Sequence, residues 1–292
     1  MMVREPSVAG RFYPQDRRGC LEAIEAMHRP REFPDVPDRP VGGVVPHAGW
    51  LFSGETALAV FAAIESRRRP VTFVIFGTPH RPVPGHVLFP EGAWHTPLGP
   101  VEVDGRLAEE VLGRAGAEGL LEADPVAHEG EHSIEVQLPL LQYLFADFRI
   151  VPILAVADAT APLLGRIVGQ AIRDRRADAV VIGSSDLTHY GPMYGFAPKG
   201  LGEAALRWVR EENDRRMIDL MLALKAEEVI DEARTHLNAC GAGAIAATLA
   251  AARVLGATRG VLVQYTTSHD ALRQRMGRAD YDAVVGYPGV VF

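Results

Sequence analysis

Short apolar runs rich in β-branched residues alternate with helical patterns along the whole chain, and this alternation is what most constrains the fold. The strand candidates are Val41–Val45, Val71–Phe76, His86–Phe89, Phe148–Val156, Ala177–Ile182, Gly260–Tyr265 and Ala283–Val285. The helix candidates are Arg17–His28, 57–64, Gly105–Ala115, 134–145, Ala161–Asp174, Leu201–Leu224 and Ala239–Val254. Continuous apolar strands separated by helices favour a mostly parallel sheet covered on both faces. The sequence therefore predicts the α/β class, as a single three-layer α/β/α domain over residues 1–292.

Composition excludes several classes of protein. The 37 acidic residues outnumber the 30 basic ones, and the densest basic run is only Arg67–Arg69, so nucleic acid is not the expected partner. No run approaches the roughly 18 to 20 apolar residues of a membrane helix. The first residues lack the basic-then-apolar layout of a signal peptide, which favours a cytoplasmic protein. Two cysteines do not make a disulfide scaffold in a chain of this length.

Four predicted strands are each followed by a histidine within a few residues of the strand's carboxyl end. VGGVV leads to His47, VTFVIF to His80, ADAVVIG to His189 and GVLVQY to His269. Ligands of open parallel sheets bind at this edge, where short loops converge. A lone histidine there is more often a hydrogen-bonded turn residue than a ligand, but four together favour one shared polar site.

Two further segments carry reactive side chains. Glu131 and Glu135 are four residues apart at the expected start of an amphipathic helix and should face the same way. Glu135 is more simply interpreted as an acid that complements the helix dipole. Cys240 stands just before a helix of small residues, where the helix dipole would lower the pKa of its thiol.

Absent motifs narrow the chemistry. There is no G-x-S-x-G elbow, no H-E-x-x-H helix and no G-x-x-x-x-G-K-[ST] loop, which argues against a serine hydrolase, a zincin and a P-loop NTPase. Scattered histidines with a carboxylate or thiolate fit a catalytic metal held by three ligands, with coordination positions left open. Asp186, in the Ser184–His189 segment, could instead cap a turn.

At these same residues the chain resembles the Memo family (mediator of ErbB-driven cell motility), whose prokaryotic members are often called AmmeMemoRadiSam system protein B. The matching blocks follow one another in order over essentially the whole chain. They are Glu5–Tyr13, Pro46–Trp50, Gly77–His80, Glu131–Glu135, Ser184–His189 and the Cys240-Gly241 turn.

The resemblance implies a fold like that of the class III extradiol ring-cleaving dioxygenases, which hold a non-haem iron. Carried over by position, His47, His80 and Cys240 would bind one transition metal ion, with Fe(II) favoured and Cu or Zn as alternatives. His189 would be the acid/base histidine, with Asp186 beside it. The third ligand of the ring-cleaving enzymes is a glutamate, so Cys240 is a departure from their pattern.

Other positions are assigned more loosely by the resemblance. Glu131, His132 and His269 would belong to the second shell or the pocket, although related sequences often have a small residue in place of His269. Many relatives read Pro-Ser-His-His where this chain has Thr78-Pro79-His80-Arg81, so the pocket wall differs while the ligand assignment stands.

Three hypotheses follow for the function. The first is a metal-dependent, dioxygenase-like oxidoreductase acting on a small molecule or on dioxygen, with His189 moving a proton. The second is a non-catalytic protein that binds a peptide or a partner protein in the same crevice. The third is copper or redox handling, because a thiolate favours Cu(I).

Overall fold

The computed structural model describes residues 2–277, 279 and 281–292. Within them, a nine-stranded sheet has the order β10-β12-β2-β9-β3-β8-β4-β7, with β11 paired to β12. The strands are β2 Gly42–Val45, β3 Thr72–Gly77, β4 His86–Leu88, β7 Leu121–Ala123, β8 Arg149–Leu154, β9 Ala179–Ser184, β10 His189–Tyr190, β11 Val261–Thr267 and β12 Val284–Val291. Each of the seven predicted strands is present; β12 extends six residues beyond its predicted end at Val285, and the other ends differ by at most two residues.

The centre of this sheet is parallel and its margins are antiparallel. Strands β2, β9, β3 and β8 run in the same direction, whereas β12 and β4 run against their neighbours β2 and β8. The side chains of β2, β3 and β9 are buried on both faces, which explains why they read as continuous apolar runs. The parallel centre places the carboxyl ends of β2, β3 and β9 at one edge.

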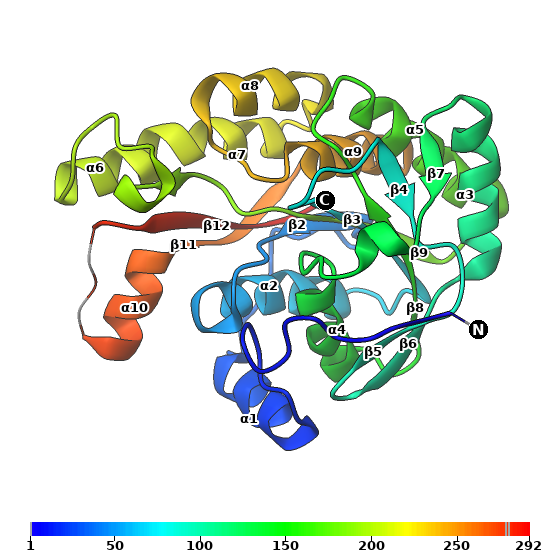
Figure 1. Ribbon diagram of the computed structural model, residues 1–292, viewed down its shortest axis with the longest axis horizontal. Coiled ribbons are helices and arrows are strands. Elements are labelled where there is room, and N and C mark those ends of the chain that lie inside the picture. Colours follow the sequence, from blue (N-terminus) through cyan, green and yellow to red (C-terminus); the bar gives the residue numbers. More distant parts are fainter. Residues whose placement is uncertain (1, 278, 280) are drawn as a thin grey trace.

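Helices cover both faces of the sheet, as Figure 1 shows. Helices α5, α7, α8 and α9 lie above it in that view, and α1, α2, α4 and α10 lie below. The helices are α1 Arg17–Met27, α2 Trp50–Glu65, α3 Gly105–Ala117, α4 Leu138–Leu144, α5 Ala161–Arg175, α6 Glu203–Trp208, α7 Asp214–Leu222, α8 Val229–His236, α9 Ala242–Val254 and α10 Ser268–Met276. This confirms the predicted α/β architecture with a large central sheet between helices. None of the described helices is long and apolar enough to cross a membrane.

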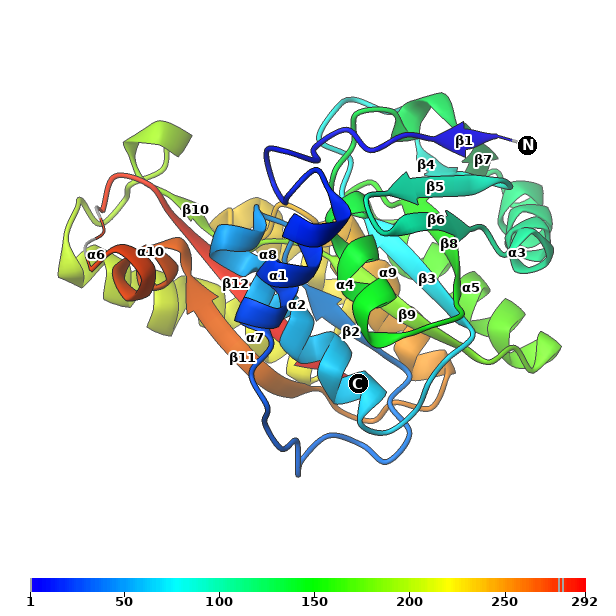
Figure 2. The ribbon, with the colours of Figure 1, turned by 90° about the horizontal axis from the view of Figure 1, so that it is seen from below.

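A second, smaller sheet was not predicted from the sequence. It has the order β1-β5-β6, from β1 Val3–Arg4, β5 Ala93–Thr96 and β6 Gly99–Glu102, and Figure 2 shows it beside the N-terminus. The Arg4 guanidinium reaches inward to the carboxylate of Glu135 (2.6 Å) and lies over the Trp94 ring. These strands are short, so they carry little periodicity to recognise.

Two of the predicted helices differ from those in the structure, one at its start and one along its length. The expected start at Glu131 is wrong, because Glu131 lies in a loop and a short 3-10 turn, Glu135–Gln137, precedes α4. Glu131 and Glu135 therefore do not share a helix face. The predicted helix 201–224 is divided into α6, a π-helical turn over Val209–Asn213, and α7. The wider turn brings Asn213 and Asp214 to the buried side together, where both hydrogen-bond Thr188.

Candidate metal centre

Three imidazole rings meet at the edge formed by the carboxyl ends of the parallel strands. His47 follows β2, His80 follows β3, and His132 lies in the loop before α4. One ligand atom from each ring lies within 4.8 Å of those of the other two. The ring centroids are 5.0 Å apart for His47 and His80, and 4.3 Å apart for His80 and His132. The predicted convergence of strand-end histidines is thus confirmed for His47 and His80, and His132 joins them.

The surroundings of His47 determine which ring nitrogen is free. The Ser184 hydroxyl donates its single hydrogen to the Ser133 carbonyl oxygen (2.7 Å), so it can only accept from His47 Nδ1, 3.1 Å away. His47 therefore carries its proton on Nδ1 and leaves the Nε2 lone pair available. Burial, together with the nearby His80, lowers the pKa of His47 well below its usual value, which keeps the ring neutral. A neutral imidazole is the form that binds a metal.

Glu131 orients His80 in the same manner. Its two carboxylate oxygens lie 3.0 and 3.1 Å from His80 Nδ1, and the His80 backbone N–H donates to it at 2.8 Å. Burial alone would raise the pKa of Glu131, but His80 and the backbone N–H groups of Ser133 and His80 hold it below its usual range. The ionised carboxylate accepts the Nδ1 hydrogen, so Nε2 is the ring nitrogen of His80 that remains for a ligand.

Cys240 lies beside His47. Its Sγ is 3.3 Å from His47 Nε2 and 3.5 Å from the Asp186 carbonyl oxygen. A nitrogen and a sulfur that bind one tetrahedral ion at about 2.0 and 2.3 Å would be roughly 3.5 Å apart. The observed separation is close to that of two ligands of one ion. Cys240, His80 and Arg81 line a pocket of about 370 Å³.

The lowered pKa predicted for the Cys240 thiol is wrong. Burial, with the nearby Asp186, raises the pKa of the thiol instead of lowering it. Helix α9 begins only at Ala242, and its N-cap Gly241 makes no side-chain cap, so Cys240 lies outside the first turn. Desolvation of the thiolate therefore outweighs the effect of the helix dipole.

Asp186 supports the loop that carries His47. Its Oδ1 accepts the His47 backbone N–H at 2.7 Å, and burial raises the pKa of its carboxyl to about 7 although that hydrogen bond opposes the shift. The side chain is buried, with 4% of its surface exposed. Its contact with the backbone, and not with an imidazole ring, makes it a group that positions His47.

His189 and His269 lie in different surroundings. His189 Nδ1 donates to the Leu187 carbonyl oxygen at 3.1 Å, and the ring packs edge-on to Tyr194. Burial lowers the pKa of His189, and so does the repulsion from His80. His269 is buried at the start of α10 and stacks on Tyr281; in the described part of the chain, no ring contact joins it to the three histidines.

Sequence reasoning missed the groups that hold these rings. Ser184 and Gln137 were not singled out, yet Gln137 Nε2 donates to the Pro46 carbonyl oxygen, just before His47, at 2.8 Å. Glu135 is also more than an acid near a helix start, because it accepts hydrogen bonds from the backbone of Ser7 and Val8. Ser184 and Glu135 lie inside the matching blocks and Gln137 lies two residues beyond one, but nothing in the spacing of these polar residues indicates their hydrogen-bond partners.

Comparisons with known proteins match nearly the whole chain. A family profile described as Memo-like protein matches residues 4–291. A MEMO1 family protein of Thermococcus onnurineus is 38% identical over 299 residues, which cover 100% of this chain and 99% of the relative. One from Pyrococcus abyssi is 38% identical over 99% of each chain, and one from Thermococcus kodakarensis is 39% identical over 100% of this chain and 99% of the relative.

A solved structure shows the same fold at much lower identity. It is the crystal structure of an uncharacterized protein from Escherichia coli K12, with a TM-score of 0.59 and 12% identity over 87% of this chain and 100% of the other. Its likeness concerns the fold alone. The full-length match to the family profile, with relatives near 38% identity over the same span, shows that this chain belongs to the Memo-like protein family.

Proposed function

We propose that this protein binds one transition metal ion at the three-histidine edge and uses it in a dioxygenase-like oxidation of a small molecule. The observation that carries the proposal is the shared arrangement of His47 and His80. Each ring gives its Nδ1 hydrogen to a fixed acceptor, Ser184 or Glu131, and so leaves Nε2 as the nitrogen that can bind a metal. Acceptors of this kind orient metal-binding histidines and raise their basicity.

The proposed ligands are His47, His80 and Cys240. The 3.3 Å separation of Cys240 Sγ from His47 Nε2 supports the thiol as the third ligand. His132 competes for that position, because its ring lies within the same cluster. A donor set of imidazoles and one thiol fits Fe(II), Cu or Zn, and Fe(II) is the first candidate because of the resemblance to the ring-cleaving dioxygenases.

A metal ion held by three protein ligands supplies a Lewis acid with open coordination positions. His189 would accept or return a proton at Nε2, since its Nδ1 is engaged by the Leu187 carbonyl oxygen. Asp186 would hold the His47 loop in place through its backbone. The 370 Å³ pocket beside Cys240, with Arg81 and Val83 in its wall, is of a size for a small molecule.

Metal content measured on protein purified without oxygen tests the proposal. Wild type should hold about one equivalent of metal, and His47→Ala and His80→Ala should lose most of it. His28→Ala, at the carboxyl end of α1, is the matched control and should keep the metal. Equal metal content in wild type and His80→Ala would refute the assignment.

A second comparison decides the third ligand. Loss of metal in Cys240→Ser but not in His132→Ala would assign the thiol, and the reverse result would assign the imidazole. Copper handling is the second candidate function, because a thiol 3.3 Å from an imidazole favours a soft ion. A much higher affinity for Cu(I) than for Fe(II) in anaerobic competition titrations would favour it over oxidation chemistry.

A further inference from the structure

A second, larger pocket lies at the other edge of the sheet. Its lining includes Val41 before β2, Arg68 before β3 and Ala179 at the start of β9, and its volume is about 690 Å³. The candidate metal ligands follow the opposite ends of β2 and β3. The two sites are therefore separated by roughly the length of a six-residue strand, about 20 Å.

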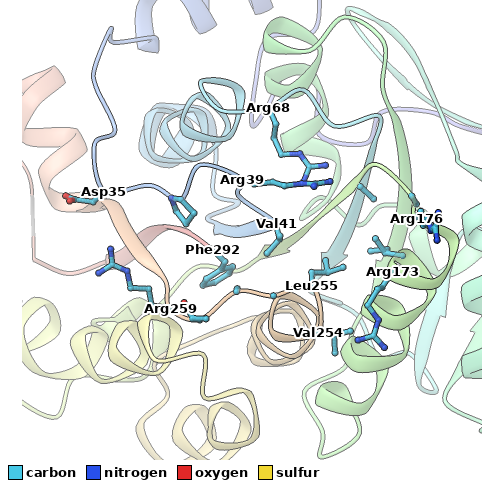
Figure 3. Close-up of a pocket in the computed structure, with 17 residues that line it drawn as sticks. Asp35, Arg39, Val41, Arg68, Arg173, Arg176, Val254, Leu255, Arg259 and Phe292 are labelled. Atoms are coloured by element: carbon cyan, nitrogen blue, oxygen red, sulfur yellow. The ribbon is translucent and has the colours of Figure 1, made fainter.

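Five arginines surround this pocket: Arg39, Arg68, Arg173, Arg176 and Arg259 (Figure 3). In the described part of the chain, no ion pair or side-chain hydrogen bond involves Arg39, Arg176 or Arg259. Arg68 pairs with Asp178 and also donates to the Pro40 carbonyl oxygen. Asp35 contributes a carboxylate to the lining of the pocket.

Positive charge remains in excess after these carboxylates are considered. Asp35 and Asp178 offset two of the five guanidinium charges, and Asp174, 3.9 Å from Arg173, offsets a third. Figure 3 shows the side chains of Arg39 and Arg68 on the same side of the pocket, and Arg68 donates to the carbonyl oxygen of Pro40, the residue that follows Arg39. Two adjacent guanidinium groups repel each other, and an anion between them relieves the repulsion while it accepts paired hydrogen bonds.

The base of the same pocket is apolar. Val41, Leu255 and the ring of Phe292 lie between the arginines in Figure 3. Phe292 is only 1% exposed, so the half-buried Val41 and Leu255 supply most of the apolar surface that a ligand could reach. Binding sites for small molecules combine such an apolar base with a few well-placed polar groups. A bare inorganic ion would use the arginines and leave this apolar surface exposed to water.

We propose that this pocket binds a small organic phosphate, with the phosphate held by Arg39 and Arg68 and an apolar ring placed over Val41, Leu255 and Phe292. The proposal goes beyond the metal site and does not rest on it. A phosphate dianion matches two neighbouring guanidinium groups in charge and in bidentate geometry. Because its base is apolar, the pocket should bind a phosphate ester that carries a ring more tightly than a free phosphate ion.

Isothermal titration with phenyl phosphate, adenosine monophosphate and flavin mononucleotide tests the proposal. Phenol, adenosine, riboflavin and inorganic phosphate are the matched probes that lack one half of the ligand. At least one ester should bind in a saturable manner, and about tenfold or more tightly than either half alone. No saturable binding by any of the three esters, or inorganic phosphate binding as tightly as the best ester, would overturn the proposal.

Variants locate the site. Arg39→Ala should weaken binding of the best ester by about tenfold or more, since hydrogen bonds to charged groups are the strong ones. Arg18→Ala removes the same charge from an exposed position on α1 and should leave the affinity unchanged. Unchanged affinity in Arg39→Ala would place the ligand elsewhere and refute the assignment. His47→Ala should bind the ester as wild type does, so a failed metal assignment and a failed phosphate site remain distinguishable.

Discussion

Replacing Glu135 with Gln should destabilise the protein strongly, because this carboxylate fastens the N-terminal segment to the body of the fold. Oε2 accepts from Arg4 (2.6 Å) and the Ser7 N–H (2.8 Å), and Oε1 accepts from the Val8 N–H (2.9 Å) and the Tyr13 hydroxyl (2.8 Å). Both oxygens are therefore used as acceptors by two donors each. Glutamine has only one acceptor oxygen, so its NH₂ group must face either Arg4 and the Ser7 N–H, or the Val8 N–H and a Tyr13 hydroxyl that has to turn to accept.

The magnitude follows from burial. The Arg4 and Glu135 side chains are 2% and 0% exposed, so the pair is removed from water. Breaking a buried ion pair from one side costs about 3–5 kcal/mol, because the remaining charge is left without compensation. For a chain of 292 residues, an unfolding entropy of about 2.1 cal/mol/K per residue converts this loss to a fall in Tm of roughly 5–8 °C.

Urea unfolding of wild type and Glu135→Gln, followed by circular dichroism, measures the loss. Glu22→Gln is the matched control, because Glu22 faces Arg18 in an exposed pair on α1 and should change stability little. A loss below about 1 kcal/mol in Glu135→Gln would refute the view that the carboxylate supports a buried arginine. A loss of the expected size in Glu22→Gln as well would show that the effect is not specific to burial.

Three further predictions concern the site and the network behind it. Gly241→Ala should lower metal content and stability, because an added Cβ would lie 2.1 Å from Thr78 Oγ1. Gly113→Ala is the control and should lower neither, because no atom lies within 4 Å of a Cβ added there. Equal behaviour of the two variants would contradict this prediction. Burial raises the pKa of Asp214 to about 6, whereas its pKa in the unfolded chain is about 3.9. The folded protein therefore holds this proton more tightly, and the stability that the bound proton contributes is lost as the pH rises towards 7. Relative to Asp214→Asn, wild type should lose about 2 kcal/mol of unfolding free energy between pH 4.5 and 7, and parallel urea-derived curves would refute the shift. His189→Ala should keep its metal by elemental analysis, because its Nδ1 donates to the backbone; loss of metal would make it a ligand.

The sequence by itself determined the layers of the fold and two of the clustered side chains. Buried parallel strands must be apolar on both faces, so they appear as continuous runs, and their carboxyl ends necessarily share one edge. His47 and His80 could be expected to meet for this reason, since each follows such a run. The same reasoning could not assign His269, because β11 is an edge strand whose partner in the described part of the sheet is the antiparallel β12.

Only the tertiary structure decided which protons and lone pairs the site presents. The free Nε2 of His47 depends on Ser184 and Ser133, which are 51 residues apart, and on the direction in which one hydroxyl donates. The raised pKa of Cys240 depends on burial that no local pattern reports. The role of Glu135 depends on Arg4, 131 residues away, reaching it through the small sheet. Hydrogen-bond direction and desolvation arise from contacts between distant segments, whereas periodicity records only the burial of neighbouring residues.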